Sequence, residues 1–294
     1  MNFSRRAFLA GAGAQLLPAA EPIIDIHQHT NYSGRTDEQL IAHQRRMGVT
    51  KTVLLPAGRM YGLEANAGGN DTVLALSKRL PGEYVFFANE LPDIPETRSE
   101  ISKYIKLGGI GIGESKFQVP VDSEHIVKLA TIAQDFGVPV LLHFQHGKYN
   151  TGYERFHTIL ARFPKVNFIG HAQTFWANID KNQSKAPTVL YPNSKVTQGG
   201  LTDRYLSDYP NMYADTSAGS GLNALLRDED HAREFIKRHQ DKMLYGSDCN
   251  DVDGHGEKCS GAQDIAAIRR LAPDEKAVRK ILHDNAARVL KIRG

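Results

Sequence analysis

The sequence predicts an α/β fold, a (β/α)₈ barrel of the TIM type. The first observation is an alternation of eight short apolar segments with segments of helical periodicity. The second is that most of the apolar segments are hydrophobic on both faces, as strands are in a parallel sheet covered by helices. The third is the length of 294 residues, because such barrels use about 250 residues as one unit. Eight repeats favour a closed barrel over an open sheet.

Each strand and helix is predicted from its own segment. The predicted strands are Ile23–His27, Thr52–Pro56, Tyr84–Ala88, Ile110–Glu114, Val138–His143, Val166–Gly170, Met212–Asp215 and Met243–Gly246. The helical segments between them are Asp37–Met47, Asp71–Leu80, Ser99–Leu107, Ser123–Phe136, Tyr153–Phe163, Asp230–His239 and Ala262–Leu271. Glycine or proline directly follows several of these helical segments and is expected to end them.

One long segment has no regular periodicity. It runs from Gln173 to Gly200, is rich in Asn, Ser, Lys, Pro and Gly, and contains the only tryptophan, Trp176. Irregular segments of this length in a compact domain are usually functional lids or disordered insertions. We expect this one to be a lid.

The first twenty residues have the pattern of an export signal. Arg5 and Arg6 precede an apolar and small-residue run that ends at Ala20. The stretch S-R-R-A-F-L resembles twin-arginine signals, whose translocase exports folded proteins. We expect residues 1–20 to be a twin-arginine-type signal peptide, residues 21–294 to be a single barrel domain, and the protein to be periplasmic or extracellular. Pro18 leaves no clean A-x-A cleavage site, so the segment could also stay as an anchor. An amphipathic N-terminal helix is the alternative.

Composition and charge exclude two classes of partner. Hydrophobic residues make up 41% and charged residues 23% of the chain, as in soluble globular proteins. Removing residues 1–20 takes away two arginines and no acids, which lowers the net charge from +3 to +1. No basic stripe with interleaved aromatics predicts nucleic-acid binding, and no later apolar stretch reaches the roughly 18 residues of a membrane span. The expected partners are a small-molecule substrate, the translocase during export and, as one option, further copies in a homo-oligomer.

The sequence Asp25-Ile-His27-Gln-His29 ends the first predicted strand. In an extended chain, residues two apart point the same way, so both imidazoles can share one cation. Neutral imidazole suits zinc, iron or nickel. Asp25 lies on the same side and could accept a hydrogen bond from a ligand histidine.

Three further strands end in polar side chains of the same kind. His143 ends the fifth strand, His171 follows the sixth, and Asp248 follows the eighth. In this architecture, catalytic residues collect at the carboxyl ends of the strands. Because several strands end in such side chains at the same face of the barrel, we expect these side chains to form one shared site.

These residues and their surroundings resemble the amidohydrolase superfamily, in its amidohydrolase-related ("family 2") branch of metal-dependent barrel hydrolases and decarboxylases. The resemblance spans residues 23–291 and includes D-I-H-Q-H, Y-P-N-M-Y-A-D-T-S, L-Y-G-S-D and H-D-N-A-A-R-V-L. It implies that His27, His29 and His143 bind a metal. It also implies that Asp248 is a ligand or the general base, and that His171 is a second-metal ligand or an acid/base group.

The number of metal ions depends on whether a residue of the fourth strand bridges two of them. Glu114 resembles the bridging glutamate of some members of the superfamily, whereas others carry a carboxylated lysine, for which Lys116 is the candidate. Glutamate is already an anion that can bridge two cations, so we favour Glu114. The expected cofactors are one or two divalent metal ions, with zinc first.

The predicted activity is hydrolysis of a cyclic ester, an amide or a related C–O or C–N bond by a metal-activated water. Non-oxidative decarboxylation at the same site and a non-catalytic metal- or ligand-binding barrel are the alternatives. A nuclease activity is disfavoured by the near-neutral mature charge. Ser217 is not expected to be a nucleophile. Residues that could meet a substrate are Arg59, Asn89, Glu90, His146, Lys148 and Arg204.

Cys249 and Cys259 follow the eighth strand and lie in one short stretch of the chain. In an oxidising compartment they could form a disulfide, or they could remain free thiols. Histidines within helical segments, His43 among them, are expected to pack or to lie at the surface.

Overall fold

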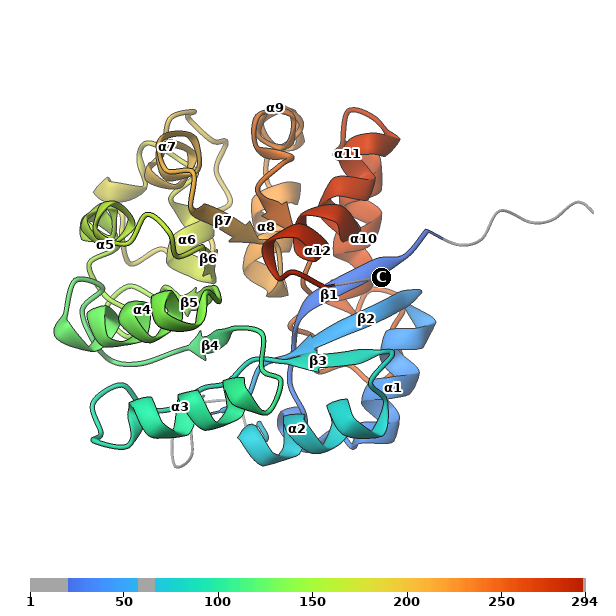
Figure 1. The fold of residues 1–294 in the computed structure, drawn as a ribbon. Helices are drawn as coiled ribbons and strands as arrows, with labels where there is room; N and C mark the ends of the chain where they lie inside the picture. Colours follow the sequence, from blue (N-terminus) through green and yellow to red (C-terminus); the bar gives the residue numbers. More distant parts are fainter. Residues whose placement is uncertain (1–20, 58–66, 293–294) are drawn as a thin grey trace, which may run out of the picture.

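The computed structural model describes residues 21–57 and 67–292, and eight parallel strands form its centre (Figure 1). The strands are β1 Ile23–Gln28, β2 Val49–Leu54, β3 Tyr84–Phe86, β4 Ile112–Ser115, β5 Val140–His143, β6 Phe168–His171, β7 Met212–Asp215 and β8 Met243–Leu244. Each overlaps one of the eight predicted strands. Their hydrophobic side chains are buried on both faces, which explains why continuous apolar runs, and not alternating ones, predicted them.

The strands close into a barrel. Hydrogen bonding joins them in the orders β1-β2-β3 and β4-β5-β6-β7-β8. An isolated parallel bridge between Ala88 and Ile112 connects β3 with β4. On the other side, the backbone N–H of Ile26 donates to the carbonyl of Tyr245 at 3.0 Å, and that of Asp248 donates to the carbonyl of His27 at 2.8 Å. The predicted (β/α)₈ barrel is confirmed.

Helices surround the strands (Figure 1). They are α1 Asp37–Arg46, α2 Asn70–Arg79, α3 Thr97–Lys106, α4 Glu124–Phe136, α5 His157–Arg162, α6 Gln173–Ala177, α7 Leu201–Asp208, α8 Ala218–Leu226, α9 Glu229–His239, α10 Ser260–Leu271, α11 Glu275–Arg279 and α12 Asn285–Val289. The predicted helix from Tyr153 to Phe163 is in fact a 3₁₀ turn, Tyr153–Arg155, followed by α5. Within the described ranges, no helix is long and apolar enough to cross a membrane.

The hydrophobic core has two parts. The larger part lies between the strands and the surrounding helices. The smaller part combines apolar side chains from most of the strands with residues at the end of α12. Its buried members are Ile24, Ile26, Val53, Leu55, Phe87, Leu141, Ile169, Tyr213, Leu244, Ala286, Val289 and Leu290. This packing fills the barrel with hydrocarbon, as in other barrels of this class, so buried polar groups gather at the carboxyl ends of the strands.

The predicted irregular segment from Gln173 to Gly200 is partly helical. It begins with α6, which places Trp176 in the core at 2% exposure. The indole N–H of Trp176 donates to the carbonyl of Asp215 at 2.8 Å. The first part of the segment is therefore a packed element and not a lid. The sequence did not indicate this helix because a helix of five residues is too short to give a periodic pattern. Beyond α6 and a 3₁₀ turn at Gln183–Lys185 the segment is irregular as predicted.

Candidate metal centre

The six predicted site residues converge at the carboxyl ends of the strands. His27 and His29 come from β1 and its end, Glu114 from β4, His143 from β5, His171 from β6, and Asp248 follows β8. The five from β1 to β6 are buried, with side chains at most 6% exposed, and Asp248 is nearly so. In three overlapping groups their nitrogen and oxygen atoms lie within 4.8 Å of one another: His27, His29 and Glu114; His27, His171 and Asp248; Glu114, His143 and His171.

Three of the imidazoles are held by their Nδ1 atoms. Nδ1 of His29 donates to the carbonyl of Leu55 at 2.7 Å, since a carbonyl oxygen can only accept. Nδ1 of His27 lies 2.6 Å from Oδ2 of Asp215, and Nδ1 of His171 lies 2.8 Å from Oγ of Ser217. These contacts leave the Nε2 atoms of all three rings facing the centre. Such outer contacts fix the ring orientation that a metal ligand needs.

The carboxylate of Glu114 lies between two pairs of histidines. Its Oε2 atom is 3.8 Å from Nε2 of His27 and 3.7 Å from Nε2 of His29. Its Oε1 atom is 2.6 Å from Nδ1 of His143 and 3.7 Å from Nε2 of His171. One carboxylate oxygen therefore faces each pair, and the ionised Oε1 accepts a hydrogen bond from Nδ1 of His143, which leaves Nε2 of that ring as the atom that could bind an ion.

Asp248 faces the same space from the opposite side of the barrel ring. Its Oδ1 atom is 3.4 Å from Nε2 of His29 and 3.8 Å from Nε2 of His27, and its Oδ2 atom is 3.5 Å from Nε2 of His171. The backbone of Asp248 adopts φ +38°, in the left-handed region. Such conformations in residues other than glycine persist where the surroundings enforce them, often at functional sites.

Three buried atoms of the centre lack a hydrogen-bonding partner among the described residues: Nε2 of His27, Nε2 of His143 and Oδ1 of Asp248. A buried polar atom left unpaired costs about 1–3 kcal/mol. A cation would satisfy all three, because each offers a lone pair when the imidazoles are neutral. The donor set of imidazole and carboxylate suits a divalent metal.

The electrostatics of the centre keep its acids ionised. Burial alone would raise the pKa of Glu114, but His143 and His27 hold it well below its usual value. Burial would likewise raise the pKa of Asp248, and His27, His171 and His29 lower it well below the usual range. Burial lowers the pKa of His143 to about 4 despite the nearby Glu114. His143 is therefore neutral at neutral pH, the state in which imidazole binds metals.

The residue that orients His27 is Asp215 and not Asp25. Asp25 was predicted to accept from a ligand imidazole, but its carboxylate accepts from the backbone N–H of His27 at 3.0 Å and from Nε2 of Gln44 at 3.0 Å. The register of β1 is irregular between Asp25 and Gln28, so simple alternation does not hold there. Asp215, at the end of β7, takes this position. Its position at the end of a predicted strand could have identified Asp215 as a residue of the centre from the sequence.

Lys116, the alternative on the fourth strand, lies close enough to His143 for its charge to lower the pKa of that imidazole. Its Nζ atom lies 5.4 Å from the ring centre of Tyr149. Ser217 contacts His171 through its hydroxyl group and thereby supports an imidazole of the centre. Glu114 therefore lies among the four histidines, and its bridging role stays a prediction.

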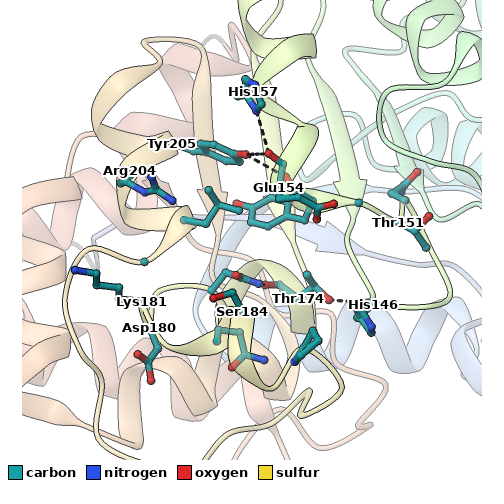
Figure 2. Close-up of a pocket in the computed structure, with 18 of the residues that line it drawn as sticks. His146, Thr151, Glu154, His157, Thr174, Asp180, Lys181, Ser184, Arg204 and Tyr205 are labelled. Atoms are coloured by element: carbon teal, nitrogen blue, oxygen red, sulfur yellow. Dashed lines mark hydrogen bonds between the residues drawn. The ribbon is translucent and has the colours of Figure 1, made fainter.

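A cavity of about 1060 Å³ lies between the loop after β5, the segment after α6, and α7 (Figure 2), and none of the six residues of the centre lines it. His146 and Arg204, which were predicted to meet a substrate, both line it. Asn150 lines it as well, and its Nδ2 donates to the carbonyl of His143 at 2.8 Å. The cavity therefore adjoins the strand end that carries a histidine of the centre.

The remaining predicted substrate contacts differ in their surroundings. Asn89 donates to the carbonyls of Pro56 and Glu114, at 3.0 and 2.8 Å, so it supports the strand ends. Glu90 is buried beside it. Lys148 lies with its Nζ atom 5.2 Å from the ring centre of Tyr149. Arg59 lies outside the described residues.

Solved structures with the same fold include two decarboxylases and a probable hydrolase. A 2,6-dihydroxybenzoate decarboxylase from Rhizobium is 13% identical, with coverage of 93% of this chain and 100% of that chain and a TM-score of 0.58. A probable 2-pyrone-4,6-dicarboxylic acid hydrolase from Acinetobacter baumannii is 14% identical, with 92% and 99% coverage and a TM-score of 0.59. A 5-carboxyvanillate decarboxylase from Novosphingobium aromaticivorans, solved with manganese, is 15% identical, with 87% and 80% coverage and a TM-score of 0.57. At these identities the likeness shows the fold.

No curated protein sequence matches this chain. The sequence profile of the amidohydrolase family, in contrast, matches residues 24–292, which includes all eight strands and the whole of the centre. The chain therefore belongs to the amidohydrolase family, whose members are metal-dependent hydrolases or decarboxylases.

Proposed function

We propose that this protein is a metal-dependent hydrolase that opens a cyclic ester, an amide or a related C–O or C–N bond of a small molecule. The observation that carries the proposal is the set of unpaired buried atoms on His27, His143 and the ionised Asp248, which converge with the ionised carboxylate of Glu114. A cation would satisfy these buried lone pairs. In metal-dependent hydrolases, a divalent cation activates a water molecule and a nearby ionised acid can accept its proton.

The ligands are assigned from the distances. His27, His29 and Asp248 would hold one ion, and His143 and His171 would hold a second, with Glu114 between the two. The support for two ions is that each oxygen of Glu114 faces a different pair of histidines, at 2.6 to 3.8 Å. Zinc is our first choice because of its affinity for imidazole. A manganese ion in one structural neighbour supports a divalent cation of that class.

A divalent ion bound here supplies a nucleophile from water at neutral pH and polarises a carbonyl group. Asp248, ionised because three histidines lower its pKa, accepts the proton from the attacking water. Asp248 then passes this proton to the leaving group, while Ser217 and Asp215 orient the imidazole of His171 toward the ion that it would hold.

Non-oxidative decarboxylation is the second candidate. The observation that favours it is that two of the three structural neighbours described above are decarboxylases of aromatic acids. The same ligand set would serve that reaction, with a protonated side chain delivering a proton to the ring carbon that loses the carboxyl group.

One experiment separates the two activities. The purified protein, with its metal content measured, is incubated with a panel of lactones, cyclic amides and hydroxylated aromatic carboxylic acids. Ring opening without release of carbon dioxide supports hydrolysis, and release of carbon dioxide supports decarboxylation. If the protein binds metal in full stoichiometry but turns over no member of a broad panel, a role in metal or ligand binding replaces both.

A further inference from the structure

A second group of metal-binding side chains lies apart from the candidate centre and shares no residue with it. His43 is in α1, and Cys249 and Cys259 are at the two ends of the loop that joins β8 to α10. All three side chains are buried, with exposures of 0%, 4% and 0%. Their ligand atoms lie within 4.8 Å of one another, and both thiols are free. From its sequence, His43 was expected to pack or to lie at the surface, and nothing in the sequence connected it with the cysteines.

The distances within this group fit a tetrahedral metal site. A zinc ion bound at about 2.3 Å to sulfur and about 2.0 Å to nitrogen holds two sulfurs about 3.8 Å apart and a sulfur and a nitrogen about 3.5 Å apart. In this structure the Sγ atoms of Cys249 and Cys259 are 3.8 Å apart. Nε2 of His43 is 3.4 Å from Sγ of Cys259. Sδ of Met47, at 3.6 Å from Sγ of Cys259, lies where a fourth ligand could approach.

We propose that His43, Cys249 and Cys259 bind a thiophilic cation of the zinc class, with Met47 at the fourth corner. Thiolate and thioether ligands select soft or borderline ions such as Zn²⁺ and Cu⁺ over Mg²⁺ or Mn²⁺. Two thiolates also balance the charge of Zn²⁺, which makes the complex neutral in a buried place. This site is thus chemically distinct from the candidate centre, whose donors are imidazole and carboxylate.

The surroundings keep the three ligands together without an ion. Sγ of Cys259 accepts from the backbone N–H of Ala262 at 3.4 Å at the start of α10, and a helix N-terminus favours a thiolate. Nη1 of Arg35 donates to the carbonyls of Cys249 and Asp251, at 2.7 and 2.9 Å. These contacts hold both ends of the loop.

The loop also packs closely on α1. Gly254 has φ +69°, and a Cβ atom at this position would lie 2.6 Å from the carbonyl oxygen of His43, so only glycine fits. An ion bound to His43 and both cysteines ties the two ends of the loop to this helix. Since the loop starts directly after Asp248, the ion stabilises the segment that presents the proposed catalytic base. The role of this ion is structural.

The test uses cobalt, because thiolate ligands give bound Co²⁺ an intense near-ultraviolet charge-transfer band. The full chain is reduced, stripped of metal with a chelator and titrated with CoCl₂. The chain has two cysteines, and both belong to this group, so the band reports on this site alone. We expect the band to reach the intensity of one thiolate-bound cobalt per chain, after more than one added equivalent because the candidate centre also takes up cobalt, and to disappear on addition of excess Zn²⁺.

Variants separate this site from the candidate centre. Cys249→Ser with Cys259→Ser should abolish the band and lower the zinc content by one equivalent. His43→Gln should weaken cobalt binding at least about tenfold. Loss of a residue that only supports a metal ligand already costs about 10- to 100-fold in affinity, and His43 would be a ligand itself. His125→Gln, a partly buried histidine of α4 outside the group, is the matched control and should change nothing. His27→Ala with His29→Ala should keep the band while losing the catalytic metal.

Two results would overturn the proposal. The first is a natively folded, reduced wild-type protein that gives no band with excess cobalt; this measurement does not depend on any variant folding. The second is protein isolated without reductant from its place of function in which denaturation reveals no free thiol, because the cysteines then form a disulfide. Neither result affects the proposed hydrolase activity, which requires no cysteine.

Discussion

Nδ1 of His27 lies 2.6 Å from Oδ2 of Asp215, and both side chains are completely buried. The first and seventh strands are thereby joined through an imidazole and a carboxylate at the edge of the candidate centre. The contact fixes the ring so that Nε2 points toward Glu114 and Asp248, and the negative charge of Asp215 makes the ring a stronger donor to a metal.

Asp215→Asn should therefore weaken metal binding by about 10- to 100-fold while the protein stays folded, because the amide keeps the size but not the charge. Competition against a chelator of known affinity measures the effect. Asp264→Asn is the control. Asp264 is also buried, but burial raises its pKa well above the usual value and it contacts Thr216, so its charge does not support an imidazole. Equal losses in both variants would show that Asp215 acts only through stability.

Asp248→Asn tests the proposed base. Asparagine keeps one oxygen for the metal but cannot accept the proton, so we expect turnover to fall at least about 100-fold, the low end of general-base contributions. Metal content and the melting temperature should change little. Full activity on an identified substrate contradicts the proposed mechanism, whereas joint loss of metal and stability assigns Asp248 to metal binding alone.

Glu114→Gln tests the number of metal ions. Since each oxygen of Glu114 faces a different histidine pair, the neutral amide should hold one ion where the carboxylate holds two. Elemental analysis of the wild type and the variant gives the count. Lys116→Met is the comparison, because a carboxylated lysine would reverse the result: metal would then be lost on changing Lys116 and retained on changing Glu114.

Asp203→Asn tests a buried ion pair far from the candidate centre in the sequence. Oδ1 of Asp203 lies 2.5 Å from Nε2 of His239, and Arg238 approaches the same carboxylate at 3.1 Å. Burial alone would raise the pKa of Asp203. The hydrogen bond from His239 and the charge of Arg238 lower it by more, so the pKa lies below the usual value. The variant should lose about 2 kcal/mol of unfolding free energy at neutral pH, as for hydrogen bonds to charged groups.

The pH dependence of this contribution has a definite sign. A carboxyl group with a depressed pKa in the folded state stabilises the protein above its unfolded pKa of about 3.9, and the stabilisation disappears as pH falls through the folded value. Denaturant titrations at several pH values should therefore show the wild type and Asp203→Asn converging only in acid. Asp241→Asn, in an exposed pair with Lys280, is the control and should change stability by less than about 1 kcal/mol.

The export signal lies outside the described residues and remains a proposal based on sequence. Replacing Arg5 and Arg6 with lysine should trap the protein in the cytoplasm, because the pair is assigned to recognition by a translocase for folded proteins. Fractionation of cells that express each form measures the distribution. Unchanged export of the lysine form would remove the assignment.

Sequence reasoning located the residues of the candidate centre because parallel strands end at the same edge of a barrel. Polar side chains that interrupt apolar runs at His143, His171 and Asp248 had to meet there, whatever the detailed packing. The same logic identified all eight strands, since the barrel buries them on both sides.

Features that depend on distant contacts were not predictable in this way. Asp25 and Asp215 are both acids next to strands, and only the irregular register of β1 decides which one meets the imidazole of His27. Trp176 was placed in a loop because α6 is too short to show a period. The approach of His43 to the cysteines joins parts of the chain that no local pattern connects.

The hydrogen bond from the backbone N–H of Asp248 to the carbonyl of His27 has a consequence for how the protein is made. During synthesis His27 and His29 leave the ribosome among the first residues of the barrel, and Asp248 follows only after the residues of all eight strands. An incomplete chain can gather the four histidines and Glu114 but cannot join its last strand to its first. The full complement of metal donors therefore forms only when the segment after β8 joins β1, and it marks the molecules whose barrel has closed.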